Sequence, residues 1–204
     1  MVPDYWGEAK AHLAKRDKVL RKLVRTLPDA DLGTRGDAFQ TLARSIVGQQ
    51  ISVKAAQSIW ARFVLACGGK VTPANVIALM PETLRGCGFS GAKAAYVVDL
   101  AMHFHGGLVK PRRWARLDDE AIIEELITVK GIGRWSVEMF LIFHMMRPNV
   151  LPVGDLGLRR AMERAYNDGD ELSKDDMRRI AKPWQPFSSA ATWYLWRSLD
   201  EVNF

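Results

Sequence analysis

One stretch of this 204-residue chain, from Leu126 to Arg160, constrains the fold more than any other. Two apolar segments flank its glycines at residues 131–133, and the first of them begins before Leu126. The first segment places a stripe on one face of an amphipathic helix, formed by Ile122, Ile123, Leu126 and Ile127. The second, residues 135–146, is apolar nearly all round, which is typical of a buried helix. Two glycines around one apolar residue allow a tight helix-to-helix turn, and the exposed N–H groups that open the second helix suit an anion such as phosphate.

A further helix start is predicted at Asp155, at the end of the segment Pro152-Val153-Gly154-Asp155. An aspartate here is expected to cap the following helix and to accept backbone N–H bonds, which favour its ionised form. An ionised carboxylate can stabilise a developing positive charge or orient a water molecule. The spacing leaves a capping role and a catalytic role both open, and the two are compatible.

These motifs together resemble the helix–hairpin–helix DNA glycosylases, and within them the 3-methyladenine type II branch. The resemblance is carried by residues 131–135 (GIGRW), the hydrophobic helix after them, Asp155, and two further blocks at 44–56 and 193–197. It spans about residues 34 to 199 and corresponds to a compact form without the β-rich N-terminal lobe of larger members.

The resemblance implies an all-α fold of two helical lobes with the DNA- and base-binding cleft between them. One expected lobe is a helical bundle over residues 31–133 that ends in the hairpin. The other combines residues 1–30 with 134–204 and carries Asp155. No strand pattern with a period of two stands out along the chain, in agreement with an all-α class.

The resemblance also implies an activity, with Asp155 as the catalytic residue. The expected reaction is hydrolysis of the N-glycosidic bond of alkylated bases, of the 3-methyladenine or 7-methylguanine type, in duplex DNA during base excision repair. Some members carry a lysine directly after the hairpin's GxGR, which attacks the sugar as an amine and then nicks the strand. Trp135 stands at that position here, so the sequence predicts a monofunctional enzyme without lyase activity.

Three side chains match base-pocket positions of the family: Trp135, Met139 and Phe187. An alkylated purine carries positive charge, and an aromatic wall attracts it by about 0.5–2 kcal/mol. The alternative for each of the three is a place in the core. Ser188 stands where the family often has an arginine, which weakens any expectation about contacts at that position.

The resemblance assigns the DNA backbone to the hairpin, through Lys130, Gly131, Gly133 and Arg134. It also implies a bound Na⁺ or K⁺ ion, held by main-chain carbonyls of Ile127, Val129 and Ile132. Gln50, in a predicted tight corner at residues 48–51, matches the side chain that enters the duplex where the damaged nucleotide leaves. Its alternative role is that of a turn residue bonded to backbone.

The amino-acid composition further narrows the class of protein. The chain has 29 Lys+Arg against 23 Asp+Glu and a pI near 9.5, which suits a polyanion but does not by itself require one. Its two cysteines cannot supply a four-thiolate iron–sulfur cluster, and no cofactor is expected to be required. No signal-peptide pattern and no uninterrupted apolar run of about 18 residues is present. Together with the resemblance, which implies damaged double-stranded DNA as the partner, these features lead us to expect a monomer without a membrane partner, cytoplasmic and nucleoid-associated in a prokaryote or nuclear in a eukaryote.

Two other functions remain open at this stage. Helix–hairpin–helix elements also occur in non-catalytic DNA-binding proteins, and a related glycosylase could act on another lesion such as a deaminated base.

The N-terminal segment is expected to form one helix from Asp4 to Leu27, whose basic residues either contact DNA or face solvent.

Overall fold

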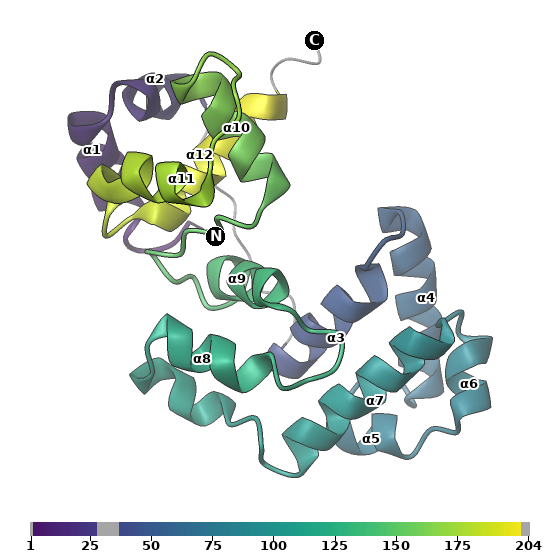
Figure 1. The fold of residues 1–204 in the computed structure, drawn as a ribbon. Coiled ribbons are helices and arrows are strands. Elements are labelled where there is room, and N and C mark those ends of the chain that lie inside the picture. The colour runs from purple at the N-terminus through teal and green to yellow at the C-terminus, as the bar shows by residue number, and fades with distance from the viewer. Residues whose placement is uncertain (1, 28–36, 201–204) are drawn as a thin grey trace. The chain divides into compact units, whose positions relative to one another are not determined.

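The computed structural model describes residues 2–27 and 37–200, and every regular element in these ranges is helical (Figure 1). The expected all-α class is confirmed. In chain order the elements are α1 (Trp6–Arg16), α2 (Lys18–Thr26), α3 (Ala38–Gly48), α4 (Val53–Ala66), α5 (Pro73–Ile77), α6 (Pro81–Gly86), α7 (Gly91–His105), η1 (Pro111–Arg116), α8 (Asp119–Leu126), α9 (Arg134–Phe143), α10 (Leu156–Tyr166), α11 (Lys174–Ala181), η2 (Lys182–Trp184) and α12 (Ser188–Asp200). The lobe boundary expected at 31 lies outside the described residues. None of the described helices is long and apolar enough to cross a membrane.

The chain forms two compact units. The first consists of Met1–Gly33 and Leu141–Phe204, and the second of Thr34–Phe140, so the division falls inside α9. Whether these units are the two domains expected from the sequence, 31–133 and 1–30 with 134–204, stays a prediction.

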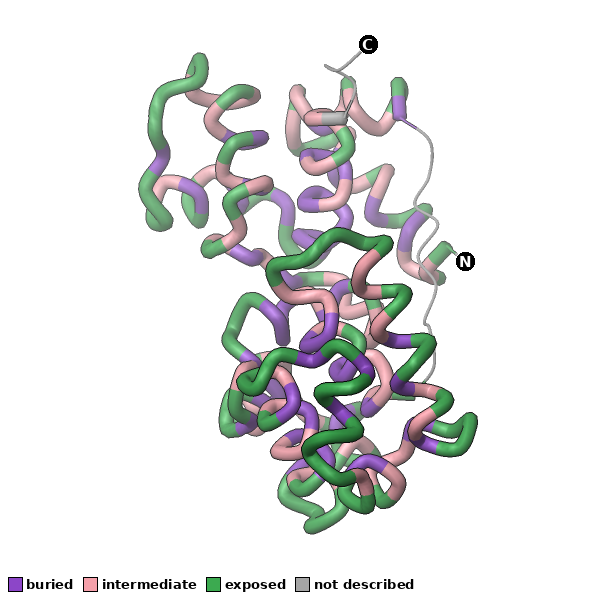
Figure 2. The backbone as a smooth tube through the Cα atoms, turned by 90° about the vertical axis from the view of Figure 1, so that its right-hand side faces the viewer, coloured by how far each residue is buried: buried purple, intermediate pink, exposed green. Residues whose placement is uncertain are grey.

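Helix α12 is the centre of the first unit and packs against α1, α2 and α10 (Figure 1). Its buried residues include the small Ser189, Ala190 and Ala191, and small side chains let neighbouring helices approach closely. The apolar core around it contains Trp6, Leu13, Leu20, Leu158, Met162, Met177, Trp184, Phe187, Tyr194 and Leu195. Buried positions recur along each helix with exposed positions between them, as amphipathic helices require (Figure 2).

The first helical segment is interrupted at Asp17, and the expectation of one helix from Asp4 to Leu27 is wrong. The backbone of Asp17 is extended, with φ −139° and ψ 125°. Its Oδ1 accepts the N–H groups of Val19 and Leu20 at 2.8 and 3.0 Å. Aspartate competes in this way with the helical hydrogen bonds of its own neighbourhood, so it ends α1 and caps α2.

The other oxygen of Asp17 ties the N-terminal helices to the rest of the first unit. Oδ2 accepts the hydroxyl of Tyr166 and the indole Nε1–H of Trp184, both at 2.9 Å. Burial, together with the Asp17 carboxylate, raises the pKa of Tyr166 well above its ordinary value, so the hydroxyl stays a donor. One side chain therefore fixes a helix start and two distant aromatic residues.

Helix α7 is the centre of the second unit and packs against α3, α5 and α6, while α4 packs on α3. Ser52, Thr72 and Asp118 accept backbone N–H groups at the starts of α4, α5 and α8 and so cap these helices. Two features were not predicted: the short η1, and the capping of α7 by Ser90. Capping side chains thus set most helix boundaries in this unit.

Replacing Asp17 by alanine should destabilise the first unit, because it removes a helix cap and leaves the Tyr166 and Trp184 donors without their acceptor. We expect the free energy of unfolding to fall by about 2–4 kcal/mol. Urea denaturation of the full chain measures this. Asp175→Ala is the matched control, since Asp175 makes only an exposed ion pair with Arg178 and should change stability by less than about 1 kcal/mol. Equal effects of the two substitutions would contradict the anchoring role.

Candidate active site

The turn between α8 and α9 requires glycine at one of its two glycine positions. Gly131 has φ 80°, and a Cβ built on it would lie 2.2 Å from the Tyr96 ring. No residue with a side chain therefore fits at position 131. A Cβ on Gly133 would meet no heavy atom within 4 Å, and its φ is not in the left-handed region. The fold therefore explains why residue 131 is a glycine. The space beside Gly133 is open to a molecule that approaches from outside.

The predicted tight corner after α3 is confirmed, and it is bonded directly to this turn. Gln49 donates its side-chain N–H to the carbonyl oxygen of Gly131 at 2.8 Å. Lys93 donates to the carbonyl oxygens of Val47 and Gln49 at 2.8 and 2.6 Å. Burial lowers the pKa of Lys93. The exposed Gln50 next to these bonds has φ 55°, a left-handed conformation that is uncommon for a residue with a side chain.

The side chain of Arg134, at the start of α9, is held within the second unit. Its Nη1 and Nη2 donate to the two oxygens of Glu120 at 2.6 and 2.7 Å, and its Nε donates to Glu138 at 3.2 Å. The guanidinium lowers the pKa of Glu120 through these bonds and raises its own. Because the side chain is paired in this way, the predicted anion contact of Arg134 would have to come from its backbone N–H. Lys130 is exposed, and its backbone N–H donates to Asp99 at 2.8 Å.

The carbonyls assigned to a monovalent cation lie in this same turn. Ile127 is the C-cap of α8, where helix carbonyls lack intrahelical partners. The Val129 oxygen accepts the Ile132 N–H at 3.1 Å, which leaves its second lone pair for another partner. Carbonyl oxygens of this kind suit a Na⁺ or K⁺ ion chemically. Among residues 2–27 and 37–200, no group of three His, Cys, Asp or Glu side chains is placed to hold a metal.

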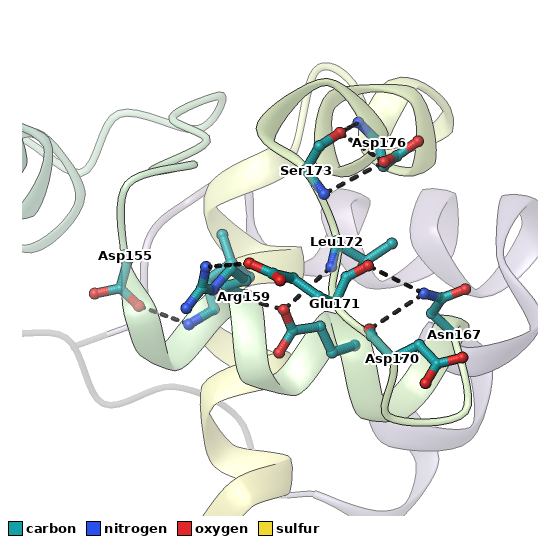
Figure 3. A network of polar contacts seen from close by, with 10 residues as sticks. Asp155, Arg159, Asn167, Asp170, Glu171, Leu172, Ser173 and Asp176 are labelled. Carbon is teal, nitrogen blue, oxygen red and sulfur yellow. Dashed lines mark hydrogen bonds and ion pairs between the residues drawn. The ribbon is translucent and has the colours of Figure 1, made fainter.

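Asp155 caps α10, as the sequence predicted, and it accepts a second bond that the sequence did not reveal. Its Oδ1 accepts the Leu158 N–H at 2.6 Å and the indole Nε1–H of Trp196 at 2.8 Å. Figure 3 shows one oxygen directed at the start of α10 and the other directed away from that helix. Phe143 stacks on Trp196, with ring centroids 5.7 Å apart and planes inclined by 17°. Only the block at 193–197 hinted at Trp196, and no local pattern links it to Asp155.

The loop that leads to Asp155 is fastened to the first turn of α12 by two buried serines. Ser188 donates to the Asn149 side chain at 2.8 Å. Ser189 donates to the Arg147 carbonyl at 2.6 Å and accepts the Val150 N–H at 2.9 Å. Ser188, at the position where the resembling family often has an arginine, therefore supports the loop of the catalytic candidate in this chain.

A cavity of about 340 Å³ adjoins Asp155 between the start of α10 and the loop before α11. Its charged lining residues include Arg159, Glu171 and Lys174. Figure 3 shows the first two of these. Arg159 lies 3.4 Å from Glu171 and 3.6 Å from Glu163, so its positive charge is shared between two carboxylates. These pairs are partly exposed and contribute little stability, but they fix Arg159 one turn beyond Asp155.

The three predicted base-pocket residues fall in two places. Trp135 is 49% exposed, and Met139 follows it by one turn of α9 on the same helix face, which continues to Phe143. Phe187 is buried in the first unit, where its ring stacks on Tyr5 with a centroid distance of 6.2 Å. The structure therefore aligns Trp135 with Met139 on one helix, and packs Phe187 as a core residue of the first unit.

Residues 43–186 match the family described as HhH-GPD superfamily base excision DNA repair protein. The chain belongs to this family. The HhH-GPD match covers the hairpin, Asp155 and the corner at Gln49, which are the features that the structure brings out. It ends just before Phe187 and α12.

Individual HhH-GPD relatives are similar over most of the chain. A putative DNA-3-methyladenine glycosylase of Bacillus subtilis is 32% identical over 79% of this chain, which spans 59% of that relative's length. The DNA-3-methyladenine glycosidase structure from Bacillus halodurans superposes with a TM-score of 0.88 at 32% identity, covering 96% of this chain and 90% of that one. The 3-methyladenine DNA glycosylase Mag1 of Schizosaccharomyces pombe, solved in complex with abasic DNA, gives 0.80 at 31% identity, covering 97% and 98%.

The two hairpin glycines should respond differently to alanine. Gly131→Ala combines a left-handed φ with overlap of the Tyr96 ring, and should cost at least about 2 kcal/mol of stability. Gly133→Ala meets no neighbour and should change the free energy of unfolding by less than about 1 kcal/mol. Chemical denaturation of both variants checks this, and a destabilised Gly133→Ala would show that the second glycine also serves the fold.

Proposed function

We propose that the protein is a monofunctional DNA glycosylase that hydrolyses the N-glycosidic bond of alkylated bases in duplex DNA, as a step of base excision repair. The observation that carries this proposal is the carboxylate of Asp155, held at the start of α10 by two N–H donors in a chain of the HhH-GPD family. The similar proteins named as 3-methyladenine glycosylases favour alkylated purines as the substrate class.

Hydrolysis of the N-glycosidic bond requires one ionised carboxylate near the sugar. As the C1′–N bond breaks, the alkylated base leaves with the bonding electron pair and becomes neutral, because alkylation had made it cationic. The sugar becomes oxocarbenium-like, and the charge of Asp155 stabilises it. Water then forms the new C1′–O bond and loses one proton, which leaves an abasic site. No amine is needed, and Trp135 stands where lyase members of the family carry their lysine.

DNA would be held by two parts of the second unit that are bonded to each other. Backbone N–H groups of Gly131, Gly133 and Arg134 are proposed to bind a phosphate, with Lys130 beside them and an ion held by the carbonyls of the same turn. Gln50 is proposed to fill the place of the extruded nucleotide. Its left-handed backbone supports this, since strain of this kind persists at functional sites.

The base itself would meet aromatic and thioether side chains. Trp135 and Met139 are the stronger candidates, because they share an exposed to half-buried face of α9. Phe187 is a weaker one, because its ring is buried against Tyr5. The protein is proposed to act as a monomer on damaged duplex DNA, without a membrane partner and in whichever compartment holds the DNA.

Base release from methylated DNA tests the enzyme directly. Asp155→Asn keeps a capping side chain but removes the charge, and should slow release at least about 100-fold while leaving the fold intact. Asp175→Asn, on an exposed helix face, is the control and should match the wild type. A panel of duplexes with one lesion each then identifies the preferred base. If wild type and Asp155→Asn release base equally slowly from every duplex, the chain is a non-catalytic DNA-binding protein instead.

DNA affinity tests the hairpin separately from catalysis. Gly133→Ala should weaken binding to a duplex with a stable abasic analogue about 10-fold, because a methyl group occupies the approach to the backbone N–H groups. Gly91→Ala, which also meets no neighbouring atom, should leave the Kd unchanged. Fluorescence anisotropy at several salt concentrations measures both, and affinity should fall as salt rises. Unchanged binding by Gly133→Ala would place the phosphate contact elsewhere.

A further inference from the structure

An apolar groove of about 530 Å³ lies on the second unit, between α7 on one side and α6 with the residue region just before it on the other. Figure 1 shows α6 beside α7, and the two helices are in contact. The lining from α7 recurs at intervals of three and four residues and so occupies one face of that helix: Gly91, Ala94, Ala95, Val98, Asp99 and Met102. Small side chains over the first turns of this face leave the groove open along about three turns of α7.

The groove presents large apolar side chains to solvent. Met102, in its lining, is 59% exposed. Met80, between the lining residues Leu79 and Pro81, is 65% exposed. Exposed apolar surface of this kind is typical of an interaction site, and methionine adapts its shape to a partner because it is unbranched and flexible. The groove therefore favours a partner that brings apolar side chains.

Two cations in the lining add a charge requirement, Arg85 near the end of α6 and Lys130 in the turn after α8. Both are exposed, and neither side chain makes a hydrogen bond or ion pair with the residues that the structure describes. In contrast, Arg134 and Arg159 are each paired with carboxylates. Asp99, the acidic residue of the lining, accepts the backbone N–H of Lys130 at 2.8 Å and is thus already bonded within the unit. Arg85 and Lys130 are therefore available to carboxylates of a partner.

The shape and the charges together match an amphipathic helix that carries acidic residues. Every regular element that the structure describes is helical, so the groove offers no sheet edge to which an extended peptide could add. A groove between helices instead takes apolar side chains at positions i, i+3 or i+4, and i+7 of a partner helix. A nucleic acid would use the two cations through its phosphates but would leave the apolar lining unused.

We propose that the groove between α6 and α7 is a docking site for an acidic amphipathic helix of a partner protein. The apolar face of that helix lies against α7, and its carboxylates meet Arg85 and Lys130. Met102 follows Lys93 by nine residues (102 − 93), about two and a half helical turns, so the groove lies on the side of α7 opposite the one that holds the corner at Gln49. The inference does not depend on Asp155 or on catalysis.

A displayed library of random peptides of about 16 residues, long enough for four helical turns, tests the proposal on the full chain. We expect the enriched peptides to combine apolar residues at helical spacing with at least two carboxylates. NMR spectra of the labelled full chain should then show the largest peptide-induced shifts in α6 and α7. Enrichment of peptides without acidic residues, shifts confined to other helices, or no enrichment at all would each overturn the proposal.

Charge reversal in the groove gives the sharper test. Arg85→Glu should weaken binding of a selected acidic peptide about 10-fold, and a peptide with lysine in place of its acidic residues should regain that affinity for Arg85→Glu. Met102→Glu places a charge in the apolar lining and should weaken binding at least about 10-fold. Arg112→Glu, at an exposed arginine of η1 outside the groove, is the control and should leave the Kd unchanged. Fluorescence anisotropy measures all four combinations.

Other occupants of the groove have their own signatures. If Arg85→Glu weakens binding to undamaged duplex DNA but not to the peptide, the groove contacts nucleic acid and the proposal is wrong. A wild-type dimer in sedimentation that Met102→Glu dissociates would show a second copy of the chain in the groove, which overturns it as well. Base release by Met102→Glu should equal that of the wild type, so failure of the proposed function and failure of the docking site are read out separately.

Discussion

The structure depends on one recurring interaction, the carboxylate that accepts backbone N–H groups at the start of a helix. Asp155 and Asp17 both do so, yet they are used differently. Asp17 takes two backbone donors on one oxygen and two aromatic side-chain donors on the other. Asp155 takes one backbone donor and one indole donor on the same oxygen. The first arrangement engages both oxygens of Asp17 for stability, and the second fixes Oδ1 of Asp155 at the start of α10.

The parts of the site that come from one stretch of sequence could be predicted from it. The hairpin glycines, the cap at Asp155 and the corner before Ser52 each follow from residue types at short spacing, where local sterics and capping decide the backbone. The same reasoning failed at Asp17. An apolar stripe continues through that residue, and only the competition of its carboxylate with the helix ends α1.

The contacts that complete the site could not be predicted, because they join residues far apart in the chain. No local sequence pattern indicates that the Trp196 indole donates a hydrogen bond to Asp155. The same holds for the hydrogen bond from Ser188 to Asn149.

The bond from Gln49 to the Gly131 carbonyl, spanning 82 positions, carries a consequence for how this protein can change. The corner that presents Gln50 and the turn that presents the backbone amides share that bond, so neither can shift in register without the other. A substitution that shifts the backbone of the corner therefore also shifts the turn between α8 and α9. The corner and the turn therefore act as a single mechanical part, which Lys93 fastens through its bonds to the carbonyl oxygens of Val47 and Gln49.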